Sequence, residues 1–183
     1  MKRSSESGFS YIDVMIALVI LMVGVLALLA GISASILQSK GHEQQLVAKQ
    51  VATSTMESIM SVKETDPTRL GWGAIGNVGT NPDENGVNQG IFPAGLRDVY
   101  MDPGPDEIIG TTDDTGTQVQ AMQRSIAITD VCDPDRPSPI CSPPGTSAIR
   151  IRAITVTVRY FVGAMQRQEV LQTVLTDYAV TNN

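Results

Sequence analysis

The hydrophobic and polar residues of this chain change pattern several times along its length. Residues 14–30 read VMIALVILMVGVLALLA, an apolar run without a charged side chain. An α-helix rises ~1.5 Å per residue, so about 20 apolar residues cross the hydrocarbon core of a bilayer. The run is apolar on every side of a helix, whereas a helix on a soluble core is apolar on one side. We therefore expect residues 9–31 to form a transmembrane helix.

The following segment, residues 32–65, is amphipathic. Ile36, Val47, Val51 and Ile59 lie near helical spacing, with charged and amide side chains between them. Proline cannot continue the backbone hydrogen bonding of a helix, so Pro67 should end it. Together the two segments predict one helix over residues 9–64, whose second half packs on a globular domain.

Residues 66–183 predict a β-rich domain. Residues 66–120 are rich in Gly, Pro, Asn and Asp, which is typical of turns and long loops. Residues 123–131, 153–161 and 169–180 alternate and contain many β-branched residues, which predicts strands. The expected fold class is α+β, a long N-terminal helix packed on an antiparallel sheet of three to five strands.

The parity of the isoleucines and the single tryptophan predict two further features of this domain. Ile149 and Ile151 fall on the opposite parity from Ile154 and Val156, which predicts a bulge or strand break at residues 152–153. The only tryptophan, Trp72, is expected to fill a small core, with a ligand platform as the alternative.

The basic residues indicate the orientation in a membrane. Lys2 and Arg3 precede the apolar run, and no Lys or Arg follows until Lys40. The positive-inside tendency then keeps the N-terminus in the cytoplasm and places the β-rich domain outside. An ordinary secretory signal peptide, cut within residues 31–35, is the alternative.

The junction before the apolar run reads SGFSYID at residues 7–13. A short basic leader that ends in glycine, followed by Phe and an acidic residue, resembles the type IV prepilin and pseudopilin signature. That family usually has Glu where this chain has Asp13. The resemblance implies that residues 1–8 are a leader and that a prepilin peptidase cuts between Gly8 and Phe9. It also implies N-methylation of the new amine of Phe9.

Asp13 is a candidate functional residue because a carboxylate beside a hydrocarbon segment costs several kcal/mol unless it is paired. The resemblance implies that it pairs with the α-amino group of a neighbouring subunit during filament assembly. The alternative is a first-turn acidic residue that the helix dipole favours by a few tenths of a kcal/mol.

The strand-rich end of the chain is similar to minor pilins of the PilV type. This implies a minor pilin, a structural and assembly subunit in or at the tip of a type IV pilus. The partners would be the prepilin peptidase, other major and minor pilins, an inner-membrane assembly platform and membrane lipid. The chain would be a single-pass inner-membrane protein with a periplasmic domain before it enters a pilus or pseudopilus. A minor pseudopilin of a type II secretion or competence system, and a membrane-anchored adhesin or ligand-binding module, are the alternatives.

The two cysteines, Cys132 and Cys141, lie outside the membrane in this orientation, where oxidation is favoured. We expect a disulfide between them. Two thiolates without a nearby His are too few for a structural zinc site, so no metal site is expected. Residues 81–86 and 102–116 are acidic but match no complete calcium-loop pattern, so we expect no cofactor and keep calcium as an alternative.

The sequence contains few features that would indicate an enzyme. His42 is the only histidine, and no phosphate-binding glycine loop or dinucleotide fingerprint is present. The formal net charge of −6 argues against nucleic-acid binding, because a nucleic-acid binder needs a basic surface. We therefore expect a substrate of a peptidase and not an enzyme.

Overall fold

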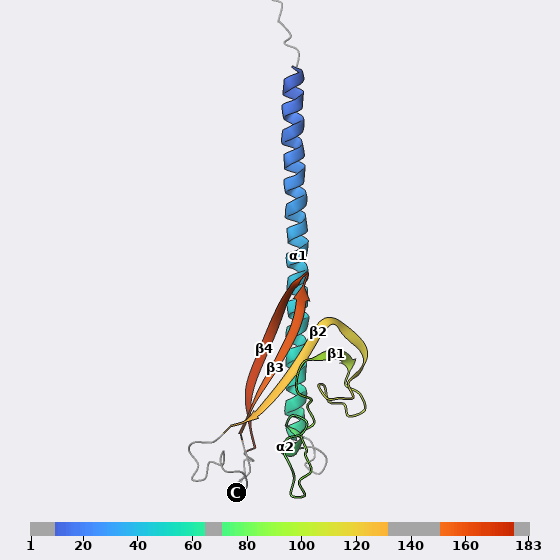
Figure 1. Cartoon of the computed structure of the whole chain (residues 1–183), viewed down its shortest axis with the longest axis vertical. Helices are drawn as coiled ribbons and strands as arrows, with labels where there is room; N and C mark the ends of the chain where they lie inside the picture. Colours follow the sequence, from blue (N-terminus) through green and yellow to red (C-terminus); the bar gives the residue numbers. More distant parts are fainter. Residues whose placement is uncertain (1–9, 65–70, 132–150, 178–183) are drawn as a thin grey trace, which may run out of the picture. The chain divides into compact units, whose positions relative to one another are not determined.

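The fold is a long helix with a four-stranded antiparallel sheet, seen in a computed structural model (Figure 1). The structure describes residues 10–64, 71–131 and 151–177, without the side chains of Gln120 and Ala121. The elements in chain order are α1 (Tyr11–Glu64), α2 (Gly71–Ala74), β1 (Arg97–Asp102), β2 (Thr115–Asp130), β3 (Ile151–Val162) and β4 (Met165–Thr176). The α+β class and the long N-terminal helix are confirmed.

The chain divides into two compact units within α1. The first unit ends at His42, and the second begins at Glu43 and contains every strand. We call the second unit the head domain. It includes the second half of α1, which the amphipathic pattern predicted to pack on a globular domain.

The four strands of the head domain pair in the order β1-β2-β3-β4, each antiparallel to the next. The β2–β3 ladder runs from Met122 opposite Tyr160 to Asp130 opposite Arg152. The β3–β4 ladder continues without a register shift from Ile151 opposite Thr176 to Val162 opposite Met165. Among the described strands, β1 and β4 are the edge strands of this sheet.

One face of the sheet and one face of α1 form the core. Alternate residues of β3 point inward, and Ile154, Val156, Val158 and Tyr160 are at most 2% exposed, as the alternation predicted. The second half of α1 contributes the small and apolar residues Ala48, Ala52, Met56, Ile59 and Val62. Burial of one large apolar side chain stabilises the fold by about 1.5–3 kcal/mol, so these contacts hold α1 on the sheet.

The structure corrects the expectation that residues 66–120 contain only turns and loops. This stretch contains α2, β1 and the first residues of β2, which begins at Thr115 and not at residue 123. β1 was missed because Val99 is its only buried residue, so RDVYMD lacks the apolar alternation that marks a strand.

The predicted bulge at residues 152–153 is wrong. β3 runs straight through these positions, and Arg152 takes the inward place before Ile154 with 5% exposure. An inward position of β3 is occupied here by a buried arginine, so the alternation of apolar residues alone does not give the register of the strand. The last strand, β4, ends at Thr176, whereas the pattern predicted residues 169–180.

Candidate functional site

The first half of α1 exposes apolar side chains on all its sides. Every described residue from Ser10 to Lys40 is exposed, including Ile16, Leu21 and Leu29. An apolar surface of this extent needs lipid or another protein to cover it. α1 is the one helix of the described residues that is long and apolar enough to cross a membrane, by length and composition.

Asp13 and Ser10 cap the N-terminus of α1. Its Oδ2 accepts a hydrogen bond from the Ser10 backbone N–H at 3.3 Å, and the Ser10 Oγ accepts one from Ile12 N–H at 3.4 Å. This reciprocal arrangement is a capping box, which satisfies backbone donors that an α-helix leaves free at its start. The sequence analysis missed it, although Ser followed three residues later by an acidic residue is its sequence signal.

The same carboxylate forms no ion pair with another of the described residues. Among the residues that the structure describes, the ion pairs are Arg124–Asp114 and Arg152–Asp130, and neither involves Asp13. Capping uses one oxygen of Asp13 but does not neutralise its charge. A charged group next to a membrane span calls for a partner, and the described residues contain no cation paired with Asp13.

The glycines of the first half of α1 leave the helix surface open. A Cβ atom on Gly24 or Gly31 would meet nothing within 4 Å, and α1 continues through both. Within the described residues, no contact requires glycine at these two positions. Small residues in a membrane span let another helix approach closely.

Several residues predicted from sequence lie outside the described residues. They are the cleavage residues Gly8 and Phe9 and the cysteines Cys132 and Cys141. His42 is described and is exposed on α1, at the boundary between the two units.

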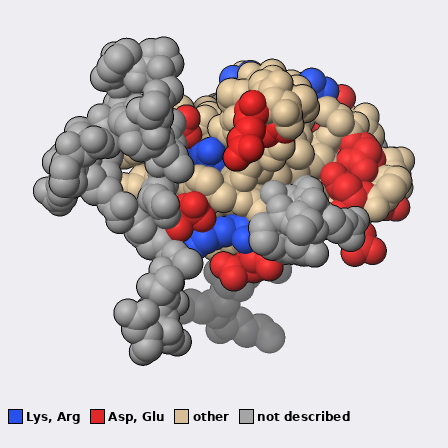
Figure 2. All heavy atoms as spheres, turned by 90° about the horizontal axis from the view of Figure 1, so that it is seen from below, with Lys and Arg blue, Asp and Glu red and all other residues tan. Residues whose placement is uncertain are grey.

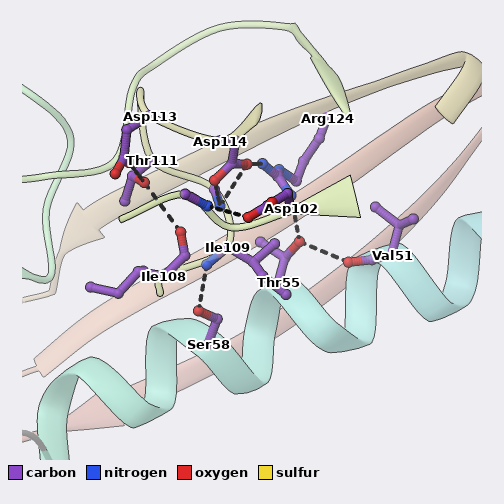
Figure 3. Close-up of polar contacts among 12 residues, drawn as sticks. Val51, Thr55, Ser58, Asp102, Ile108, Ile109, Thr111, Asp113, Asp114 and Arg124 are labelled. Atoms are coloured by element: carbon purple, nitrogen blue, oxygen red, sulfur yellow. Dashed lines mark hydrogen bonds and ion pairs between the residues drawn. The ribbon is translucent and has the colours of Figure 1, made fainter. Parts of the chain in front are cut away.

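In the head domain, polar contacts fix the loop between β1 and β2 to α1 (Figure 3). This loop comprises residues 103–114. Its Ile109 backbone N–H donates to Ser58 Oγ at 2.9 Å. Arg124 Nη2 lies 2.6 Å from Asp114 Oδ2, and Arg124 Nη1 donates to Thr55 Oγ1 at 3.1 Å. The side chains of Arg124 and Asp114 are buried, so the pair links the loop, β2 and α1 inside the domain.

The carboxylates of Asp106 and Asp113 accept hydrogen bonds from groups within the 103–114 loop. Asp113 accepts a hydrogen bond from the Thr111 hydroxyl at 2.6 Å, and this bond lowers the pKa of Asp113. Asp106 accepts one from the Ile108 backbone N–H at 2.8 Å, but partial burial raises the pKa of Asp106. The two residues also meet directly, because Asp106 N–H donates to Asp113 Oδ2 at 3.2 Å.

The acidic stretches that kept calcium as an alternative form hydrogen bonds and an ion pair within the head domain. No three acidic, His or Cys side chains of the described residues converge in a way that would hold a metal ion. In the second acidic stretch, Asp114 pairs with Arg124 and Asp102 accepts a hydrogen bond from Gly104 N–H. In the first, Asp83 accepts from the backbone N–H groups of Asn85 and Val87. These carboxylates stabilise turns.

Arg152 is buried, with 5% of its surface exposed, although the alternation of apolar residues in β3 did not predict a buried arginine. Its Nη1 donates to the carbonyl oxygens of Trp72 and Ile75, the latter at 2.7 Å, and its Nε donates to Asp130 Oδ1 at 3.1 Å. Its guanidinium also lies over the Trp72 ring, 4.5 Å from the centroid. Burial lowers the pKa of Arg152. Trp72 packs half-buried against the core, as expected, and through Arg152 it ties α2 to the sheet.

A polar cleft of about 310 Å³ opens between the β1 edge and the 103–114 loop. Arg97, Tyr100, Thr111 and Gln123 line it together with the buried Arg124–Asp114 pair. Trp72, which the ligand-binding alternative placed at the binding surface, is not among its lining residues. On the face of the molecule in Figure 2, acidic side chains form separate patches with a few basic ones between them.

Comparisons of this chain with protein-family models, with curated proteins and with solved structures found no match. The long N-terminal apolar helix over an antiparallel sheet is consistent with a pilin-like fold.

Proposed function

We propose that this chain is a minor pilin, a subunit that enters a type IV pilus or its tip through the first half of α1. The observation that carries the proposal is the combination found in α1. Its first half is apolar and exposed on all sides, and its first turn carries a single carboxylate, Asp13, which forms no ion pair with another described residue. A lipid bilayer covers such a helix before assembly, and other helices of the same kind cover it in a filament.

The proposed sequence of events begins with hydrolysis of the Gly8–Phe9 peptide bond by a prepilin peptidase. This step removes the leader with Lys2 and Arg3 and leaves the α-amino group of Phe9 four residues before Asp13. The freed amine is then N-methylated. An amine of this kind, on the same or a neighbouring subunit, supplies a cation for Asp13. Pairing between subunits would fix the axial position of one α1 against the next.

Two features of the described residues support this role. Gly24 and Gly31 leave space for a neighbouring helix, because a Cβ at either position meets nothing in the chain. The second half of α1 is held on the sheet by its own core, so the first half is free to contact partners while the head domain stays folded.

The capping box makes a sharp test of Asp13 possible, because capping and charge can be separated. Asp13→Asn keeps a side-chain oxygen that can accept the Ser10 N–H but removes the charge. Ser10→Ala removes the hydroxyl cap but keeps the charge of Asp13. If Asp13 acts by ion pairing, Asp13→Asn abolishes incorporation into filaments, Asp13→Glu restores it, and Ser10→Ala retains it.

The measurement is the amount of the variant chain in sheared filaments relative to the membrane fraction. Normal incorporation of Asp13→Asn would refute the pairing role. N-terminal mass analysis of the membrane-extracted chain, with and without the prepilin peptidase, tests the class itself. A chain that begins at N-methylated Phe9 only when the peptidase is present supports the proposal. A chain that begins within residues 31–35 contradicts it.

A minor pseudopilin of a secretion or competence system would use the same helix in the same way. The two differ in the assembly that the chain enters. Co-purification of the processed chain with sheared surface pili, as opposed to retention in the periplasm, separates them.

A further inference from the structure

The turn between β3 and β4 lies at the end of the head domain where α1 enters it (Figure 1). Gln45, near the start of the α1 segment that belongs to the head domain, donates to Glu169 Oε1 of β4 at 2.7 Å. The groove next to this contact is lined by Lys49 and Ala52 of α1 together with Leu171 of β4. Later residues of β4 therefore face later residues of α1. The residues of β4 before Glu169 extend in the opposite sense, toward the beginning of the head domain.

The β3–β4 hairpin is long enough to reach a bilayer that α1 crosses. With residues 9–31 in the hydrocarbon core, the headgroup layer adds about 5–7 Å and so extends to about Ile36. Ile36 precedes Gln45 by nine residues of continuous helix, which is ~14 Å. β4 runs back four residues from Glu169 to Met165, which is ~13 Å. The two lengths agree, so the turn has the reach to enter the headgroup layer.

The turn exposes apolar side chains. Phe161 and Met165 flank it and are 44% and 59% exposed, and Gly163 and Ala164 at its tip are exposed as well. Val162 pairs with Met165, so these two tip residues project from the end of the sheet. Exposed apolar side chains beside a bilayer gain free energy when they enter its interface.

The charges around the turn are positive although the chain as a whole is acidic. Residues 155–168 contain Arg159 and Arg167 and no Asp or Glu, in a chain with 19 acidic and 13 basic residues. Residues 14–42 of α1 contain Lys40 and likewise no Asp or Glu. Neither arginine forms an ion pair with another described residue. Basic side chains next to a membrane are attracted to anionic lipid headgroups.

We propose that residues 159–167 form a second membrane contact, which inserts Phe161 and Met165 into the headgroup layer and places Arg159 and Arg167 beside anionic lipid phosphates. The partner is a bilayer surface because the turn belongs to the same chain as a helix long and apolar enough to cross a membrane. Six residues of helix separate Leu37, the last apolar residue before Lys40, from the first residue of the head domain. A bilayer is therefore within reach of the turn before any other subunit binds.

This inference goes beyond the proposed filament role, because it concerns the head domain while the chain is still in the membrane. It requires α1 to cross a bilayer but does not require a filament. Filament incorporation and contact of the turn with lipid are separate measurements, so one can fail while the other succeeds.

The test uses the full chain in vesicles of phosphatidylcholine and phosphatidylglycerol. Some of the lipid carries a nitroxide on its headgroup, which quenches nearby tryptophans. Met165→Trp is compared with Val174→Trp, because both native side chains are 59% exposed on β4 and lie nine residues, ~30 Å, apart. Both variants retain Trp72, whose emission in the native chain is subtracted. The proposal predicts that Met165→Trp is quenched several-fold more strongly than Val174→Trp.

A third variant establishes that α1 has entered the bilayer. Leu29→Trp lies within the apolar run and should be quenched by lipids that carry bromine in their acyl chains. Equal quenching of Met165→Trp and Val174→Trp in vesicles where Leu29→Trp is quenched would overturn the membrane contact and leave the filament role standing. An unquenched Leu29→Trp would overturn both, because both require α1 to enter a bilayer.

The charges are tested by Arg167→Gln in the Met165→Trp chain. Its quenching should fall several-fold in vesicles with phosphatidylglycerol, to the level found in phosphatidylcholine alone. Arg97→Gln, the same change at an exposed position of β1, is the matched control and should leave the quenching unchanged. Circular dichroism of both variants establishes that the head domain is folded. Equal quenching in the two glutamine variants would overturn the proposed contact with anionic lipid.

Discussion

Asp114 and Arg124 form a buried ion pair, in which Asp114 Oδ2 lies 2.6 Å from Arg124 Nη2 and the side chains are 5% and 6% exposed. The pair is satisfied on both sides. Asp114 also accepts from the Gly110 backbone N–H, and Arg124 donates to Thr55 of α1. The contact therefore joins three separate segments of the head domain. A buried pair of this kind costs more to break than to replace.

We predict that Asp114→Ala and Arg124→Met each destabilise the head domain by about 3–5 kcal/mol, because each leaves one buried charge without a partner. The double variant should lose clearly less than the sum of the two single losses. Urea unfolding of the full chain in detergent, followed by the fluorescence of Trp72, measures these free energies. Strictly additive losses would show that the two side chains do not stabilise each other.

Arg152 and Trp72 give a second prediction. Lysine cannot reproduce the planar guanidinium that donates to two carbonyl oxygens and to Asp130 while it covers the Trp72 ring. Arg152→Lys should therefore destabilise the head domain by about 1–3 kcal/mol, the cost of leaving buried polar groups unsatisfied.

Arg167→Lys is the matched control for Arg152→Lys. It makes the same change at an exposed position of the neighbouring strand β4. Its effect should lie within about 0.5 kcal/mol, as is usual for substitutions away from buried networks. The emission of Trp72 should change in Arg152→Lys only. Equal effects of the two variants would contradict the role assigned to Arg152.

The long helix and strand β3 could be predicted because their apolar residues repeat at the period of the element that they form. The uniform apolar run predicted the first half of α1. The alternation of apolar and polar residues predicted the inward face of β3 from Ile154 to Tyr160. Asp13 stood out because a charge beside such a run is unusual. These signals are local, so a single sequence contains them.

Other contacts could not be predicted because they join residues far apart in the chain. Asn77 donates to the carbonyl oxygens of Phe92 and Ile126 and accepts from Ile128 N–H, and so covers the edge of β2 beyond β1. Nothing around Asn77 in the sequence indicates these partners. Arg152 broke the expected alternation for a similar reason, since its acceptors lie nearly eighty residues earlier, in the segment of Trp72 and Ile75.

The disulfide between Cys132 and Cys141 remains a prediction from sequence, since both residues lie outside the described residues. A disulfide that closes so short a loop should stabilise the domain by about 2–3 kcal/mol. Alkylation without reductant should add no mass to the full chain, and alkylation after reduction should add two labels. Because the chain has no other cysteine, labelling before reduction would refute the bond directly.

Asp106 and Asp113 predict opposite effects of pH on stability. The pKa of Asp113 is lowered below its ordinary value of 3.8, so its carboxylate stabilises the fold above pH 3.8 and this contribution is lost as the pH falls through the lower folded value. The pKa of Asp106 is raised, so its ionised form opposes folding above the raised value. That penalty fades as the pH falls toward 3.8.

We therefore expect Asp113→Asn to lower the melting temperature of the full chain at neutral pH. The deficit should shrink as the pH falls from 3.8 toward the lower pKa of the folded Asp113. Asp106→Asn keeps an oxygen that can accept the Ile108 N–H and removes the penalty, so its melting temperature at neutral pH should equal or exceed that of the native chain. Thermal unfolding of the three chains from neutral to acidic pH measures both trends. A loss of the same sign and pH dependence in the two variants would contradict the assignment, because the two carboxylates would then experience the same environment.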